Sequence, residues 1–267
     1  MRNGNNNFNW SQDRWQGINK VVHDESAKIR LRDVFPLWGN SGGYVDSVVG
    51  HEVTLTPGQP LKIKAGQNLV PVELSVEFQL SPEQFHDEQV AEALATRAAY
   101  ILALAEDAVL LQGNSSRRFL TSLNVVERNL DEQHGLFNEN QPQVERPILE
   151  SILEGIKRLR TRNHHGEYCV IVSPDLYQEA FAPRQNTLDA PIYEIRPLLR
   201  EGGFLYSQAA PEKTGVIFSL GGHTLDIAVP VDVMVELTDE EKGVALLRVV
   251  EQFRLRENDR TAVEALV

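Results

Sequence analysis

The sequence is poor in the features that mark secreted, membrane-bound or nucleic-acid-binding proteins. A single cysteine, Cys169, among 267 residues excludes a disulfide within the chain. No apolar run approaches the length of about 18 residues that a membrane-spanning helix needs, and residues 1–10 lack the basic-then-apolar order of a signal peptide. With 26 basic against 38 acidic residues, the formal net charge is −12, which argues against binding to nucleic acid. These absences predict a cytoplasmic protein without membrane or nucleic-acid partners.

Signatures of nucleotide and catalytic sites are also missing, since the chain has no G-x-G-x-x-G, Walker loop, H-E-x-x-H or C-x-x-C motif. Residues 39–43, GNSGG, match the nucleophile pattern G-x-S-x-G around Ser41. That pattern requires a strand before it and a helix after it, and here both flanks are predicted to be loop. A glycine turn is therefore favoured over a small hydrolase that uses Ser41.

Two histidine patterns have a metal-site interpretation. Glu83 and His86 have the E-x-x-H spacing of di-iron proteins, which need a second such pair and two further glutamates in a four-helix bundle. His164 and His165 lie near Cys169, but adjacent histidines at a helix end diverge, and Cys169 in an apolar strand is favoured as a buried hydrophobe. We therefore expect no enzyme activity, catalytic residue, metal or cofactor; a metal protein using the two histidines is the weaker alternative.

The clearest pattern in the chain is a long helix over residues 81–113. Ser81 begins an S-x-x-Q capping box, Pro82 suits the first helical position, and a glycine follows the last apolar residue. At 1.5 Å per residue the helix is about 46 Å long, which predicts a spine that other elements pack along. A strand of period two over residues 72–80 leads directly into it. The apolar stripe consists of Val90, Leu94, Ala98, Ile101, Ala105 and Val109.

Two further segments have apolar faces with no partner evident in the sequence. From Ser11 an amphipathic helix is predicted, and its apolar face either packs in the core or binds a partner. Residues 53–56 and 61–64 form a predicted hairpin with alternating apolar residues around a Pro-Gly turn. Exposing four such side chains would forgo about 6–12 kcal/mol, which rivals a domain's stability of about 5–15 kcal/mol. The hairpin therefore either folds back on its own domain or lies across another subunit.

The second half of the chain mixes helices and strands. We predict helices over residues 147–162 and 173–181, a buried strand over 168–172, and a polar loop over 184–190. Residues 215–220 and 223–229 flank Gly221-Gly222 and are predicted to form a hairpin, followed by strands over 232–237 and 244–256. The order of elements predicts an α+β fold rather than an alternating βαβ scaffold.

Five stretches, in order along nearly the whole chain, carry a family resemblance. They are WSQDRWQGINK, VPVELSVEFQLSPEQF, ALAEDAVLLQG, YCVIVSPDLYQEAF and GGHTLDIAVPVDVMVELTDEEKGVALLRVVEQFRLRENDRTAVEAL. Together they resemble the encapsulin nanocompartment shell proteins, once grouped with linocin-type bacteriocins, which share the tailed-phage major-capsid fold. The resemblance implies a non-enzymatic subunit that self-assembles in many copies into a closed icosahedral shell around a cargo enzyme. A major capsid protein of a tailed phage or prophage, which would have nucleic acid as a partner, is the alternative.

The resemblance also implies a division of the chain. Residues 1–43 would form an N-terminal arm and helix, and residues 44–66 an extended hairpin loop that crosses onto a neighbouring subunit. Residues 67–145 and 232–267 would form a peripheral domain containing the spine helix, and residues 146–231 an axial domain.

Candidate site residues follow from this resemblance. A groove for a cargo protein's short terminal targeting peptide would use Trp15, Ile18, Val22 and Ile29. A pore loop would contain Arg184, Gln185, Asn186 and Thr187. Subunit contacts would use Val53, Leu55, Leu61 and Ile63. Glu106 and Asp107 on the spine would form ion pairs between subunits, with a solvated helix face as the simpler alternative.

Overall fold

The computed structural model of the chain describes residues 10–38, 43–50, 52–54, 62–64, 66, 68–137, 141–184, 189–241 and 243–267. No helix in this described part combines the length and apolar character that a bilayer crossing requires. Five short 3₁₀ helices connect the longer elements: η1 (Leu31–Val34), η2 (Gly113–Ser116), η3 (Leu130–Glu132), η4 (Arg196–Leu198) and η5 (Arg260–Ala262).

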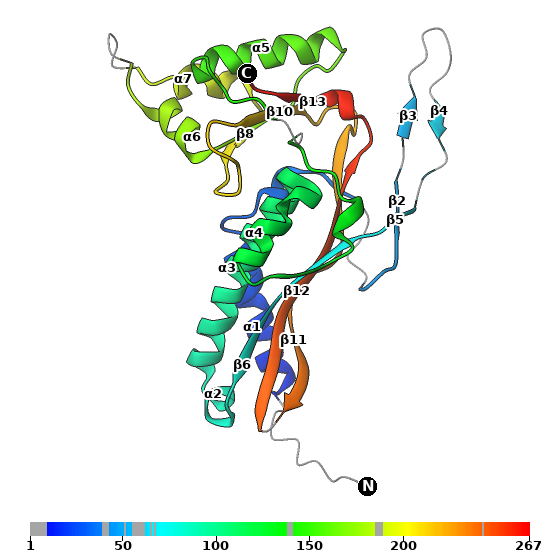
Figure 1. Ribbon diagram of the computed structural model, residues 1–267, viewed down its shortest axis with the longest axis vertical. Coiled ribbons are helices and arrows are strands. Elements are labelled where there is room, and N and C mark those ends of the chain that lie inside the picture. The colour runs from blue at the N-terminus through cyan, green and yellow to red at the C-terminus, as the bar shows by residue number, and fades with distance from the viewer. Residues whose placement is uncertain are drawn as a thin grey trace.

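A five-stranded sheet and two helices form the elongated lower part of the molecule (Figure 1). The strand order is β1 (Leu37–Trp38), β11 (Leu225–Glu241), β12 (Val244–Glu257), β6 (Val72–Leu80) and β7 (Val126–Arg128). All neighbours are antiparallel except β1 and β11. Helix α1 (Gln12–Ser26) packs against both α3 (Glu88–Gln112) and β11, and α3 packs on β6 and β12. The apolar faces of α1 and α3 are thereby buried against the sheet and against each other.

The predicted spine is two helices rather than one. Its capping box at Ser81 is confirmed, since the Ser81 hydroxyl accepts from the Gln84 backbone N–H and the Gln84 side chain accepts from the Ser81 N–H. Helix α2 (Pro82–His86) then ends, because Asp87 adopts an extended backbone conformation (φ −83°, ψ 110°). The Asp87 carboxylate accepts from the next two free N–H groups and so begins α3 as a new N-cap. The prediction of one continuous helix from residue 82 is therefore wrong, because the helix is interrupted at Asp87.

A four-stranded sheet forms the upper part of the molecule. Its order is β13 (Val263–Ala265), β10 (Gly215–Ser219), β8 (Tyr168–Val172) and β9 (Phe204–Tyr206). Helices α5 (Ile148–Thr161), α6 (Pro174–Phe181) and α7 (Ile192–Ile195) lie around it (Figure 1), and α4 (Arg117–Ser122) follows the end of α3. Because β13 is a strand of this sheet, the C-terminal residues join the sheet that residues 168–219 form, whereas the sequence placed all of 232–267 with the spine.

The hairpin predicted around Gly221-Gly222 is wrong. Both edges of β10 are already paired, one with β8 and the other with β13, so the following strand, β11, turns into the five-stranded sheet. Gly222 has a φ of +76°, as expected of a turn, but this turn connects two sheets rather than two neighbouring strands.

The four-stranded sheet separates two hydrophobic cores. Cys169 and Ile171 of β8 face the core shared with α1 and α3, whereas Val170 and Val172 face a second core under α5 and α6. β10 alternates in the same way, with Phe218 on the first side. Burial on both faces explains why β8 is a continuous apolar run without polar alternation.

The arm is a hairpin that stands apart from the rest of the chain (Figure 1). Strand β3 (Glu52–Thr54) pairs antiparallel with β4 (Lys62–Lys64), and Val53 lies opposite Ile63. Nearer the body, β2 (Val48–Val49) pairs with β5 (Asn68–Leu69). The predicted hairpin is confirmed for these strands, while Leu55 and Leu61 lie outside the described residues.

Gly113 gives a test of how tightly α3 is terminated. Its φ is +57°, and a Cβ atom there would lie 2.4 Å from the Gln133 carbonyl oxygen. Gly113→Ala should therefore cost about 2–5 kcal/mol of stability, from backbone strain plus a steric clash. The matched control is Gly166→Ala, where φ is +77° but nothing lies within 4 Å, so only the strain of about 1–2 kcal/mol applies. Equal losses of stability in the two variants, measured by thermal unfolding, would show that the backbone at Gln133 moves away from the added Cβ atom at little cost.

Candidate functional site

A buried arginine holds the segment after α1 against the spine and the long strands. Arg32 lies in η1, and its side chain is 2% exposed. Its Nη1 atom lies 3.1 Å from Glu251 Oε2 on β12 and 3.4 Å from Glu106 Oε1 on α3. Its Nη2 atom bonds Asp232 on β11. Four elements thus meet at one guanidinium, which satisfies what would otherwise be uncompensated buried charges.

The charges in this cluster do not cancel if every carboxyl is ionised. Glu106 and Glu251 are both fully buried, and burial raises the pKa of each above its ordinary value. The nearby Glu106 charge raises the pKa of Glu251 further, whereas Arg32 acts in the opposite direction on both groups. Two carboxyl groups that share one guanidinium nitrogen therefore favour retaining a proton between them.

Asp107 forms a second tie one residue further along α3. Its Oδ1 atom accepts from the Leu31 backbone N–H at 2.7 Å, and its Oδ2 atom accepts from the Ser207 hydroxyl at 2.9 Å. Burial raises the pKa of Asp107, and these two hydrogen bonds oppose that effect. Asp107 thus connects α3 to the segment after α1 and to the segment after β9.

The predicted intersubunit ion pairs of Glu106 and Asp107 are therefore wrong, as is the solvated helix face. Glu106 is 0% exposed and Asp107 2% exposed within a single chain, so neither can reach another subunit. The sequence concealed this role because their partners, Arg32 and Ser207, lie far away along the chain. The missed signal is the pair of acidic residues inside the otherwise apolar run of residues 101–111, which indicates buried partners.

The predicted groove on α1 is also largely corrected. Ile18 and Val22 are 3% and 0% exposed, because their side chains pack inside the first core and do not line a surface groove. Trp15 is half-buried and packs on Trp10, with ring centroids 4.6 Å apart. Ile29, beyond the end of α1, is half-buried and lines an open pocket. Of the four candidates, Ile29 lines this pocket.

That pocket, the β9 groove, has a volume of about 410 Å³. It lies between the segment after α1, the outer side of α3, and β9 with the residues that follow it. On one side Tyr177 of α6 stacks on Phe204 at 5.4 Å between ring centroids and contacts Tyr206 at 4.6 Å. The groove is lined by residues 27–31, Tyr100, Leu104, Asp107, Tyr177 and residues 204–208.

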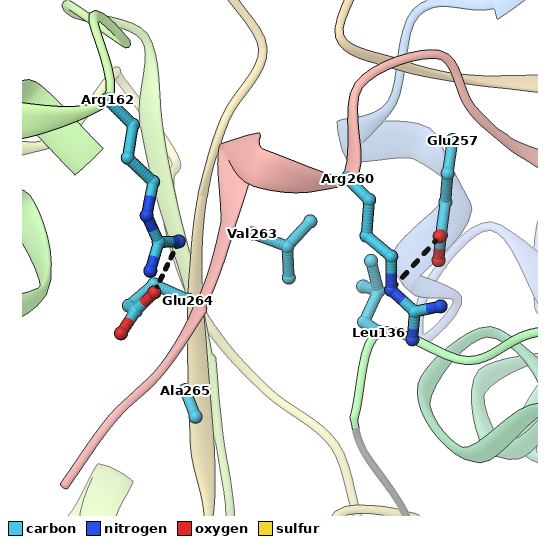
Figure 2. A pocket seen from close by; sticks show the side chains of 7 residues that line it. All are labelled: Leu136, Arg162, Glu257, Arg260, Val263, Glu264 and Ala265. Atoms are coloured by element: carbon cyan, nitrogen blue, oxygen red, sulfur yellow. Dashed lines mark ion pairs between the residues drawn. The ribbon is translucent and has the colours of Figure 1, made fainter. Parts of the chain in front are cut away.

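A smaller pocket of about 280 Å³ lies beside β13 (Figure 2). Its two arginines are each turned to a glutamate: Arg162 lies 2.7 Å from Glu264, and Arg260 lies 3.6 Å from Glu257. Each arginine is about half exposed, so these pairs contribute little stability, and they leave little net charge to attract a ligand.

Large apolar side chains are exposed around the base of the arm. Leu37 and Trp38 of β1 are 70% and 44% exposed at the edge of the five-stranded sheet, although the Trp38 ring packs 4.1 Å from the Arg256 guanidinium carbon. Tyr44 is 48% exposed, and its hydroxyl donates to Glu236 of β11. Exposed aromatic and aliphatic residues beside an open strand edge are typical of a surface that another chain covers.

The remaining candidates are spread over the molecule. Arg184 pairs with Glu194 at 2.7 Å, while Gln185, Asn186 and Thr187 lie outside the described residues, as does Ser41. His164 is buried and lies 2.9 Å from the Thr261 hydroxyl, whereas His165 is exposed.

Burial raises the pKa of Cys169 to about 12, so its thiol stays protonated. Among the described residues, no group of three or more histidine, cysteine or acidic side chains could hold a metal ion.

This architecture is the capsid-type fold. The structure is similar to the virus-like particle of Pyrococcus furiosus, with a TM-score of 0.69 and 17% identity over 95% of this chain and 99% of that one. It is also similar to the capsid protein of an empty GTA particle (TM-score 0.62, 12% identity, 89% and 95% coverage). The capsid of Myoviridae phage XM1 gives a TM-score of 0.58 at 12% identity, with coverage of 86% and 88%. At these identities the likeness shows the fold.

The family is defined by the sequence itself. Residues 4–254 match the family model Linocin_M18, described as an encapsulating protein for peroxidase, and the chain belongs to this family. A curated relative, the type 1 encapsulin shell protein EncA of Myxococcus xanthus (strain DK1622), is 29% identical over 108 residues. That match spans 40% of this chain and 37% of the relative's length. The predicted family and the predicted capsid-like α+β fold are confirmed.

The buried carboxyl pair makes stability depend on pH. An acid whose pKa is raised by folding binds more protons in the folded state, so stability falls as the pH rises from the ordinary glutamate value toward the raised one. Glu106→Gln should remove much of this slope and raise the thermal midpoint at about pH 8 by about 2–4 °C.

The control is Glu150→Gln on the exposed face of α5, which should leave the slope unchanged. Thermal unfolding from about pH 5 to about pH 9 checks both variants. A Glu106→Gln profile parallel to that of the unchanged protein would contradict the shared proton.

Proposed function

We propose that this chain is a non-enzymatic shell subunit that assembles in many copies into a closed icosahedral compartment around a cargo enzyme in the cytoplasm. The observation that supports this is the family match over residues 4–254, in a chain whose fold is that of capsid subunits. The family description, which names a peroxidase, indicates a peroxidase-class cargo. No cofactor is required for such a role.

The arm supplies the main contact between subunits in this proposal. Its strands stand apart from their own chain (Figure 1) and carry the alternating residues Val53 and Ile63. A neighbouring copy would cover the arm, and the exposed Leu37, Trp38 and Tyr44 near its base would be buried in the same assembly. Burial at about 25 cal/mol per Å² makes such contacts a strong driving force in a many-copy shell.

The predicted division of the chain enters this proposal with β13 reassigned. Most of residues 146–231, which form most of the second core, would gather with β13 as an axial domain around the symmetry axes of the shell, while the spine and the long strands would form the peripheral domain. The 184–187 loop, which begins at Arg184, would lie near a pore. The cargo would attach by a short terminal peptide near the end of α1, where Ile29 lies at the β9 groove.

A phage or prophage capsid protein is the second candidate, because the phage XM1 capsid protein has the same fold. The family match favours the encapsulating protein over this alternative. The net charge of −12 points the same way, since an inner surface facing packed nucleic acid gains nothing from excess negative charge.

Size-exclusion chromatography with electron microscopy on the purified chain tests the assembly. We expect hollow, closed particles that contain a co-purified protein. A monomer or dimer at every concentration would contradict the shell, and particles filled with DNA would favour the capsid alternative.

Replacement of Leu61 and Ile63 together with Asp tests the arm. The variant should fold, as judged by circular dichroism, yet remain unassembled, because charges would enter an apolar contact between copies. The matched control is Lys62→Asp with Lys64→Asp, which adds two carboxylates at the alternate positions of the same strand. Intact shells from the Leu61/Ile63 variant would show that the arm does not pack between copies.

A further inference from the structure

Helix α5 has an apolar stripe that is wider than its own core requires. Ile152 and Ile156 are buried in the second core, but Leu153 on the neighbouring flank is 45% exposed. Arg160 follows Leu153 by about two helical turns and so lies on the same flank. This flank borders an open groove of about 410 Å³, which we call the α5 groove. The groove is lined by Leu153, Ile156, Lys157, Arg160 and Thr161 of α5 and by Leu198 of η4.

The α5 groove is cationic as well as apolar. Elsewhere at this end of the helix, Arg158 and Arg162 both pair with Glu264, at 3.0 and 2.7 Å. In the part of the chain that the structure describes, no carboxylate forms an ion pair with Arg160. Lys157 is 75% exposed, so its ion pair on the surface contributes little. The groove therefore suits an occupant that combines an apolar group with a carboxylate.

A projecting aromatic residue of this kind lies on α7, which packs beside α5 at the upper end of the molecule (Figure 1). Tyr193 is 68% exposed, although its neighbours Ile192 and Ile195 are buried in the second core. Glu194 is 51% exposed, and its ion pair with Arg184 also lies on the surface, where exchange for another cation costs little. Tyr193 and Glu194 thus present an aromatic ring and a carboxylate side by side.

The segment of α7 and η4 carries this projection on one side and a wall of the groove on the other. Tyr193 and Leu198 are five positions apart, which corresponds to about 140° around a helix. Tyr193 therefore points away from the groove of its own chain. An apolar cavity of about 150 Å³ accepts a benzene ring, so the α5 groove, at about 410 Å³, has room for a tyrosine side chain.

We propose that the α5 groove of one copy receives Tyr193 of the next copy, where Glu194 pairs with Arg160. The complementary charges favour this occupant, because the free cation and the exposed carboxylate belong to one chain. The contact joins two different faces of the chain, and such heterologous contacts close into a ring when the rotation between copies closes. This inference rests on the proposed assembly in many copies and identifies residues through which the axial domains meet.

Photo-cross-linking with two isotopic forms of the chain tests the contact. A benzophenone amino acid replaces Tyr193 in a minority of light copies, which assemble with an excess of unchanged copies labelled with heavy nitrogen. We expect light-to-heavy cross-links at residues 149–161 or at Leu198, located by mass spectrometry in particles that electron microscopy shows to be closed. The same group at Tyr206, which is 47% exposed on β9, should not reach these residues. Closed particles with light-to-heavy cross-links only elsewhere, or with none, would overturn the proposal.

Engineered cysteines test whether the contact is heterologous. Cys169 is buried and burial raises its pKa to about 12, so introduced cysteines react alone. Tyr193→Cys chains and tagged Leu153→Cys chains are assembled together and treated with a short thiol-specific cross-linker. We expect tagged–untagged dimers, and none from either variant alone. Glu154→Cys, about 100° around α5 from Leu153, is the matched control and should cross-link about tenfold less. Dimers from Tyr193→Cys alone would show a symmetric contact and contradict the ring.

Tyr193→Ala measures how much the contact contributes. Loss of a central aromatic anchor should weaken each contact about thirtyfold, or about 2 kcal/mol at about 1.4 kcal/mol per factor of ten. The concentration at which particles form should rise accordingly, whereas Tyr193→Phe, which keeps the ring, should assemble like the unchanged chain. Unaltered assembly of Tyr193→Ala would overturn the inference. If the unchanged chain never assembles, the proposed function itself fails, which is a separate result.

Discussion

The guanidinium of Arg32 is the contact on which the arrangement of the subunit depends. It reaches Glu106 on α3, Glu251 on β12 and Asp232 on β11, so the segment after α1, the spine and two long strands cannot move independently. Removing Arg32 would leave the buried carboxyl groups of Glu106 and Glu251 without this cation, which is far more costly than the pairs are stabilising. The cluster therefore fixes the relative positions of these four elements. Because it holds more carboxyl groups than cations, its shared proton makes the stability of that arrangement depend on pH.

The four-stranded sheet extends this rigidity into the upper part of the molecule. Its inner strands, β8 and β10, are buried on both faces. The Asp107 carboxylate accepts hydrogen bonds from the Leu31 N–H, in the segment after α1, and from the Ser207 hydroxyl, just beyond β9. The β9 groove therefore has walls from three elements whose relative positions are set by buried polar contacts.

Local pattern was sufficient for much of this fold. The S-x-x-Q box located the start of α2, the alternation over 72–80 located β6, and the turn signals located the arm. One error was local: Asp87 breaks the spine because its carboxylate caps a second helix two and three residues further on. The other errors required knowledge of distant partners. The Gly221-Gly222 turn connects two sheets because both edges of β10 are already paired, and Glu106 is buried beside Arg32, which lies far away along the chain. Ile18 and Val22 were indistinguishable from a docking face, since any helix must bury one side.

The contact that the arm is proposed to make between copies depends on apolar area. The strands β3 and β4 stand apart from the rest of the chain (Figure 1), and Leu37 and Trp38 are exposed at the edge of the five-stranded sheet. Apolar area favours association strongly but with little directionality. In the proposed shell, symmetry would repeat each such contact in every copy, so a modest area per contact would add up to a stable assembly. The direction of each contact would then depend on the relative positions of helices and strands that Arg32 fixes within one chain.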